Sequence, residues 1–60
     1  MDKTYLLDQY RLAILDFQTA HTEEDQWNAR KTMARLERTA IELYGDELEK
    51  DFEQMKATIR

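Results

Sequence analysis

His21 and Asp25, four residues apart, are the best candidates in this chain for a catalytic or metal-binding pair. Histidine is the side chain whose unperturbed pKa lies nearest neutrality, so the pair suggests a general base or half of a metal site. A turn is expected at His21–Thr22, however, and a histidine at the end of a helix interacts well with the last free carbonyls. We therefore interpret His21 as a helix-terminal residue without a chemical role.

Carboxylates are abundant, with thirteen Asp and Glu residues, but their pattern does not indicate chemistry. Acid–base catalysis needs a pocket that moves two pKa values apart, and a 60-residue chain has little core from which to build one. The Glu-x-x-His motif of di-metal helical bundles and the acidic calcium loop are both missing. We expect no catalytic residue, no metal, no cofactor and no enzymatic activity, and we interpret the acids as helix caps and solvated faces.

A basic cluster in the middle of the chain suggests a different chemistry. Lys31, Arg35 and Arg38 share one face of a helix, and Trp27 lies one turn before them. Basic residues beside an aromatic ring can bind a phosphate backbone or an RNA base. The net charge is −4, whereas nucleic-acid-binding domains are usually basic overall. Nucleic-acid binding is therefore the alternative function rather than the preferred one.

The elements that position these residues are expected to be helices. The composition is 42% hydrophobic and 37% charged, with one glycine and no proline. A chain of this length buries only about 60% of its unfolded surface, so it forms one thin domain, residues 1–60. No apolar run is long enough to cross a membrane, and Met1–Tyr10 does not resemble a signal peptide. We expect a cytoplasmic protein that does not contact membranes.

The first expected helix, residues 3–20, has two apolar faces. Asp2 or Thr4 can cap its start. Its main face follows helical spacing and comprises Leu6, Tyr10, Ala13, Ile14, Phe17 and Ala20. The second face comprises Tyr5, Leu12 and Leu15, so this helix is either central to the fold or in contact with a second molecule. Either a third helix covers this second face, or a second copy of the chain does.

The second expected helix, residues 23–44, begins at the capping residue Thr22, followed by three acids that suit the positive end of the helix dipole. Its apolar seam comprises Ala29, Met33, Leu36, Ala40 and Leu43. Trp27 lies off this seam. It either closes the end of the bundle against the first helix or is an exposed interface anchor, a role in which tryptophan is enriched.

Gly45, the only glycine, marks a change in the apolar pattern. In one interpretation Gly45 ends the second helix in a left-handed conformation, and Asp46 caps a third helix, residues 46–59, with Glu49 as its reciprocal acid. In the other, the helix continues through Gly45 at a cost of about 1 kcal/mol. The change of phase favours the break. The apolar set after Gly45 is Leu48, Phe52, Met55 and Ile59, and we expect the two sides of the glycine to contact different neighbours.

The fold predicted is all-α: a short three-helix bundle, or a helical hairpin that dimerises into a four-helix type of bundle. For such a small chain, twofold self-association is a common way to bury a leftover apolar face. We expect a non-enzymatic interaction or regulatory protein that forms a homodimer or binds a protein partner through Tyr5, Leu12, Leu15 and Trp27.

Overall fold

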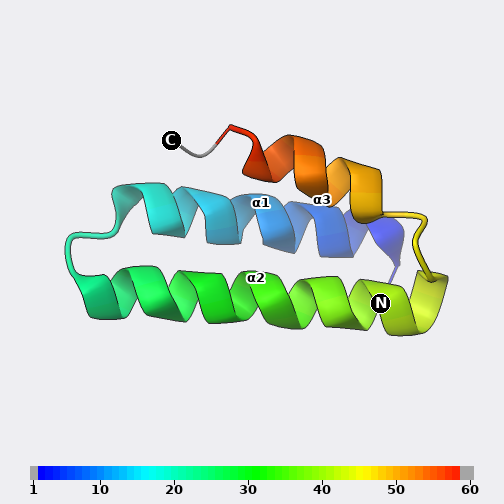
Figure 1. Ribbon diagram of the computed structural model, residues 1–60, viewed down its shortest axis with the longest axis horizontal. Helices are drawn as coiled ribbons and strands as arrows, with labels where there is room; N and C mark the ends of the chain where they lie inside the picture. Colours follow the sequence, from blue (N-terminus) through cyan, green and yellow to red (C-terminus); the bar gives the residue numbers. More distant parts are fainter. Residues whose placement is uncertain (1, 59–60) are drawn as a thin grey trace.

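The computed structural model describes residues 2–58, which form a three-helix bundle (Figure 1). Helix α1 spans Lys3–Thr19, α2 spans Glu23–Tyr44 and α3 spans Glu49–Lys56, and no strand occurs among these residues. The predicted all-α class is confirmed, and the first two helices agree with their expected ranges to within one residue. Ile59, expected in the last helix, lies outside the described residues.

Helix α1 is the central element, with α2 on one side and α3 on the other (Figure 1). Successive helices run in opposite directions, so α3 is antiparallel to α2 (Figure 1). Two polar contacts hold α3 in place: Lys56 Nζ lies 2.9 Å from Glu37 Oε1 on α2, and Gln18 Nε2 on α1 donates to the Thr58 carbonyl over 3.3 Å. Both helices that flank Gly45 therefore contact α1. The sequence predicts that the segments before and after Gly45 contact different neighbours. This prediction is wrong because both contact α1, although they meet different sides of it.

The first two helices start at side-chain caps. Asp2 Oδ1 accepts from the Tyr5 amide at 2.7 Å, and Thr22 Oγ1 accepts from the Asp25 amide at 3.1 Å. Each cap satisfies one of the amides that the first helical turn leaves unpaired. Both expected caps are confirmed, with Asp2 rather than Thr4 in that role.

Gly45 ends α2, as the interpretation with a break predicts. Its amide donates to the Ile41 carbonyl at 2.9 Å, and its backbone then turns out of the helix at φ 66° and ψ −132°. Side chains disfavour this combination, which explains why glycine stands here. Asp46 does not cap α3, so that prediction is wrong. The turn continues to Leu48, which is the N-cap residue of α3, has no side-chain cap bond and is buried in the core.

The core lies where the three helices meet. Tyr10 on α1 and Phe52 on α3 stack with ring centroids 4.3 Å apart. Leu43, expected on the buried seam of α2, is 52% exposed. It lies on the flank of the seam away from α3, where no third helix reaches it. The buried cluster comprises Leu6, Tyr10, Ala13, Ile14, Met33, Leu36, Ala40, Leu48 and Phe52.

Candidate functional site: exposed helix faces

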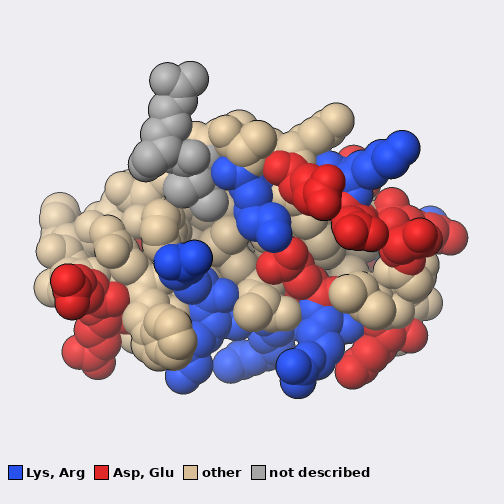
Figure 2. All heavy atoms as spheres, in the orientation of Figure 1, with Lys and Arg blue, Asp and Glu red and all other residues tan. Residues whose placement is uncertain are grey.

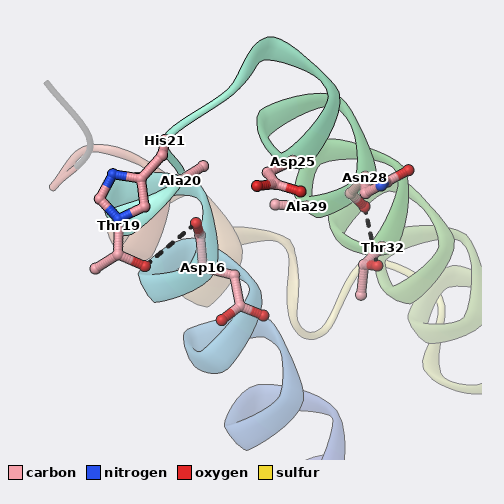
Figure 3. Close-up of a pocket in the computed structure, with 8 residues that line it drawn as sticks. All are labelled: Asp16, Thr19, Ala20, His21, Asp25, Asn28, Ala29 and Thr32. Atoms are coloured by element: carbon pink, nitrogen blue, oxygen red, sulfur yellow. Dashed lines mark hydrogen bonds between the residues drawn. The ribbon is translucent and has the colours of Figure 1, made fainter.

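The loop between α1 and α2 borders a shallow hollow of about 370 Å³ that contains His21 (Figure 3). Asp16 comes from α1, His21 from the loop and Asp25 from α2. No hydrogen bond or ion pair among the described residues joins the imidazole to either carboxylate. The nearby hydroxyls are already used, since Thr19 donates to the carbonyls of Leu15 and Asp16.

The arrangement around His21 does not assemble a reactive pair. Within residues 2–58, no group of three or more His, Asp or Glu side chains is close enough to hold a metal ion. The hollow is open to solvent, and most of the residues that line it are polar.

The second face of α1 stays exposed in the folded chain. Tyr5 is 50% exposed, and Leu12 and Leu15 are each 53% exposed. Helix α3 does not cover them, because it packs beside Leu7 and Arg11 of α1. Tyr5 and Leu12 lie about 140–160° around the helix from Leu7, counting about 100° per residue. We call Tyr5, Leu12 and Leu15 the α1 face.

Trp27 lies on the outer side of α2 and is 61% exposed. The alternative that it closes the bundle against α1 is wrong, because it points about 120–180° away from the buried residues of the seam. Lys31 and Arg38 follow it at intervals that keep them on the same side. Trp27, Lys31, Arg35 and Arg38 form what we call the basic α2 face.

The basic α2 face carries uncompensated charge. None of Lys31, Arg35 and Arg38 forms an ion pair with a described residue. Arg30 differs from them, because its guanidinium lies 5.8 Å from the ring centroid of Phe17 on α1. Figure 2 shows Lys and Arg gathered over the middle of α2, with Asp and Glu towards both ends of the molecule.

The fold does not bring the four predicted partner-binding residues together. Tyr5, Leu12 and Leu15 share the α1 face, whereas Trp27 belongs to the basic α2 face. Two exposed apolar residues were missed as surface residues: Leu43, already described, and Ile41, which is 64% exposed. The spacing of seven residues from Trp27 to Ala34 and Ile41 is the signal that places Ile41 on the outer side of α2.

Tyr10 carries the one buried polar side-chain atom among the described residues that lacks a hydrogen-bond partner. The side chain is fully buried. Burial raises the pKa of the phenol well above its ordinary value, and the nearby Glu37 carboxylate raises it further. Tyr10 is therefore a neutral core residue rather than a proton donor for chemistry.

An exposed ion pair joins the start of α1 to the turn that follows α2. Lys3 pairs with Glu47 in the turn before α3, and its ammonium lies 5.4 Å from the ring centroid of Tyr44. A hydrogen bond to Glu47 and its negative charge raise the pKa of Lys3. This contact fastens the turn to the start of α1.

No protein-family model matches this chain, and comparisons with curated proteins and with solved structures find no match either. In the described part of the chain, no helix combines the length and the apolar character that crossing a bilayer requires.

Proposed function

We propose that this chain is a helical protein–protein interaction module that works as a homodimer, with the α1 face as the contact surface. One observation carries the proposal: Tyr5, Leu12 and Leu15 stay about half exposed although α2 and α3 have covered the other apolar side of the same helix. Large apolar residues that stay exposed on one side of a helix are typical of association sites.

The pattern of α1 is complementary to itself. If two α1 helices pack antiparallel with their centres near residue 10, Tyr5 of one copy lies opposite Leu15 of the other. Leu15 of the first copy then lies opposite Tyr5 of the second. In the same arrangement Asp8 comes within one residue of Arg11 of the second copy. A twofold interface repeats each favourable contact, so the second copy is the partner that this surface fits best.

The expected dimer is weak. Fully burying a leucine-sized side chain contributes about 1.5–3 kcal/mol, and the three residues of the α1 face are already half buried. About 1 kcal/mol for each of them from both copies gives a total of about 6 kcal/mol. This corresponds to a dissociation constant of tens of micromolar before the cost of association is subtracted, so the net affinity is weaker than that.

Thermal unfolding at several protein concentrations tests the proposal. A dimer is stabilised by mass action, so Tm should rise with concentration for the native chain. The variant Leu12→Gln should show a Tm that is independent of concentration, whereas Ile41→Gln, which changes an exposed residue outside the α1 face, should behave as the native chain. A concentration-independent Tm for the native chain would remove the proposal.

Disulfide trapping tests the antiparallel arrangement. The chain has no cysteine, so single cysteines can be placed without interference. Mixing Tyr5→Cys with Leu15→Cys under mild oxidation should give the mixed disulfide in preference to either homodimer. A preference for the two homodimeric disulfides would contradict the antiparallel register and support a parallel one.

A second candidate function is binding of a nucleic acid through the basic α2 face. It is favoured by the exposure of Trp27 beside three basic residues that have no ion-pair partner among the described residues. Affinity for a single-stranded RNA should then fall steeply with salt, and both Trp27→Ala and the double variant Lys31→Gln/Arg38→Gln should weaken it. The absence of measurable binding at low salt would exclude this function.

A further inference from the structure

A groove runs between the C-terminal half of α2 and helix α3, on the opposite side of the molecule from most of the α1 face. It encloses about 320 Å³. Ala40 and Phe52 close its base and are 1% and 3% exposed, whereas Ile41, which is 64% exposed, supplies an accessible apolar wall. We call this the α2–α3 groove.

Carboxylates border the α2–α3 groove. Glu37 is paired with Lys56, but Asp46, Glu49 and Glu53 form no ion pair with a described residue. The apolar base and the acidic border are separate features of one site. The base can hold an apolar side chain, and the border attracts positive charge on either side of it.

The size of the groove limits what it can hold. Its volume lies at the lower end of the range for ligand sites, about 300–1,000 Å³, so it fits one large side chain rather than an extended molecule. The end of the groove at Gly45 is open, because a Cβ placed on that residue would meet no atom within 4 Å. A polypeptide can therefore pass over the turn with one side chain inserted.

We propose that the α2–α3 groove binds a cationic segment of a partner protein, in which one large apolar side chain is flanked within a helical turn by Lys or Arg. The apolar side chain lies on Ala40, Ile41 and Phe52. The flanking cations lie against Asp46, Glu49 and Glu53. This site uses a different surface from the proposed homodimer, and each can fail without the other.

Three fluorescein-labelled synthetic peptides test the proposal by anisotropy. The first is a lysine-rich helical peptide with a single central Trp, the second replaces that Trp with Ala, and the third replaces the lysines with Glu. The first should bind at least about tenfold more tightly than the other two, since an anchor residue of this kind commonly contributes a factor of ten or more. Equal binding of the first two peptides would overturn the proposal, because it would mean attraction by net charge alone.

Matched variants of the protein locate the binding site. Ile41→Gln and the double variant Glu49→Gln/Glu53→Gln should each weaken binding of the first peptide by about fivefold or more. The controls are Leu12→Gln, which changes an exposed apolar residue elsewhere, and Glu23→Gln/Glu24→Gln, which removes the same charge from the start of α2. Both controls should leave binding within about twofold of the native chain. Circular dichroism establishes that each variant keeps its helical content.

Two outcomes would overturn the assignment. If Glu23→Gln/Glu24→Gln weakens binding as much as Glu49→Gln/Glu53→Gln, the peptide senses overall charge and not the groove. If Ile41→Gln converts a native dimer into a monomer, a second copy of this chain occupies the groove instead of a cationic partner. A loss of dimer in Leu12→Gln with unchanged peptide binding would support both proposals separately.

Discussion

The two apolar faces of α1 have similar residues, but one is buried and the other is exposed. Leu6 and Tyr10 are completely buried, whereas Leu12 and Leu15, on the same helix, are each 53% exposed. The difference arises from topology, because α2 and α3 together cover the part of α1 that carries Leu6, Tyr10 and Ile14, and neither covers Leu12 and Leu15. A chain of this size has too little helix to enclose its central element, so one apolar face is left exposed.

The largest effect is expected on the buried face. Leu6→Ala should lower the free energy of unfolding by about 2–5 kcal/mol, because it removes buried methyl groups and leaves a cavity. Leu12→Ala, measured at a concentration where the chain is monomeric, should cost well under 1 kcal/mol. Urea unfolding followed by circular dichroism compares the two. Equal losses in the free energy of unfolding would mean that the α1 face contributes to folding of the monomer as much as the buried face does.

The turn at Gly45 is expected to have the next largest effect, since it brings α3 onto the buried side of α1. Gly45→Ala should destabilise the fold by about 1–3 kcal/mol, because an L-residue is strained at positive φ. The space around the position is open, so the cost is one of backbone conformation alone.

Chemical synthesis of the chain with D-alanine at position 45 provides the control. A D-residue adopts this conformation readily and restricts the unfolded chain, so it should be neutral or stabilising by up to about 1 kcal/mol. Destabilisation by both alanines would show that glycine is needed for a reason other than its positive φ.

Tyr10 lies on the buried face of α1 and allows a further test of the comparison between the two faces. Its hydroxyl is buried without a hydrogen-bond partner among the described residues, so Tyr10→Phe should leave stability unchanged or raise it by about 1 kcal/mol at neutral pH. Thermal or urea unfolding at pH 7 measures this change. A loss of several kcal/mol would mean that the hydroxyl makes a contact that the stability of the core requires.

Alkaline pH provides an independent test of the same group. Burial raises the pKa of Tyr10 in the folded chain, so the folded state keeps a proton that the unfolded state loses above about pH 10. The stabilisation that comes from this group is fully present below that pH. Above it, the free energy of unfolding should fall by about 1.4 kcal/mol per pH unit. The raised pKa of Lys3 acts in the same direction. Tyr10→Phe should remove most of this slope, and an unchanged slope would assign it to other groups.

The smallest effect on folding is expected at the α1 face itself. Leu12→Gln at micromolar concentration or below should change the free energy of unfolding by less than about 0.5 kcal/mol, because the residue is already half exposed. The same substitution should matter at high concentration, where the dimer contributes. Urea unfolding of native and variant chains at two concentrations separates these contributions.

The helices were predictable because their signals are local. The caps at Asp2 and Thr22, the helical spacing of the apolar residues and the break at Gly45 each depend on neighbours within a turn or two. The start of α3 was not predictable in the same way. Asp46 has the right residue type for a cap, but the position of α3 is decided by the burial of Leu48 and Phe52 against α1, which is a tertiary effect.

The surfaces were predictable only in part. Periodicity separates Tyr5, Leu12 and Leu15 from the main face of α1, but it cannot say which of two faces a third helix will cover. Ile41 and Leu43 continue apolar stripes in the sequence and yet lie on the flanks of α2, which neither α1 nor α3 covers. The α2–α3 groove is a product of the reversal at Gly45, and no local pattern indicates it.

Sedimentation velocity over a wide range of concentrations tests the central claim most directly. We predict that the native chain and Ile41→Gln shift from 7.3 kDa towards twice that mass with rising concentration, and that Leu12→Gln stays at 7.3 kDa throughout. A native chain that stays at 7.3 kDa up to near-millimolar concentration, or a Leu12→Gln variant that dimerises like the native chain, would contradict the account.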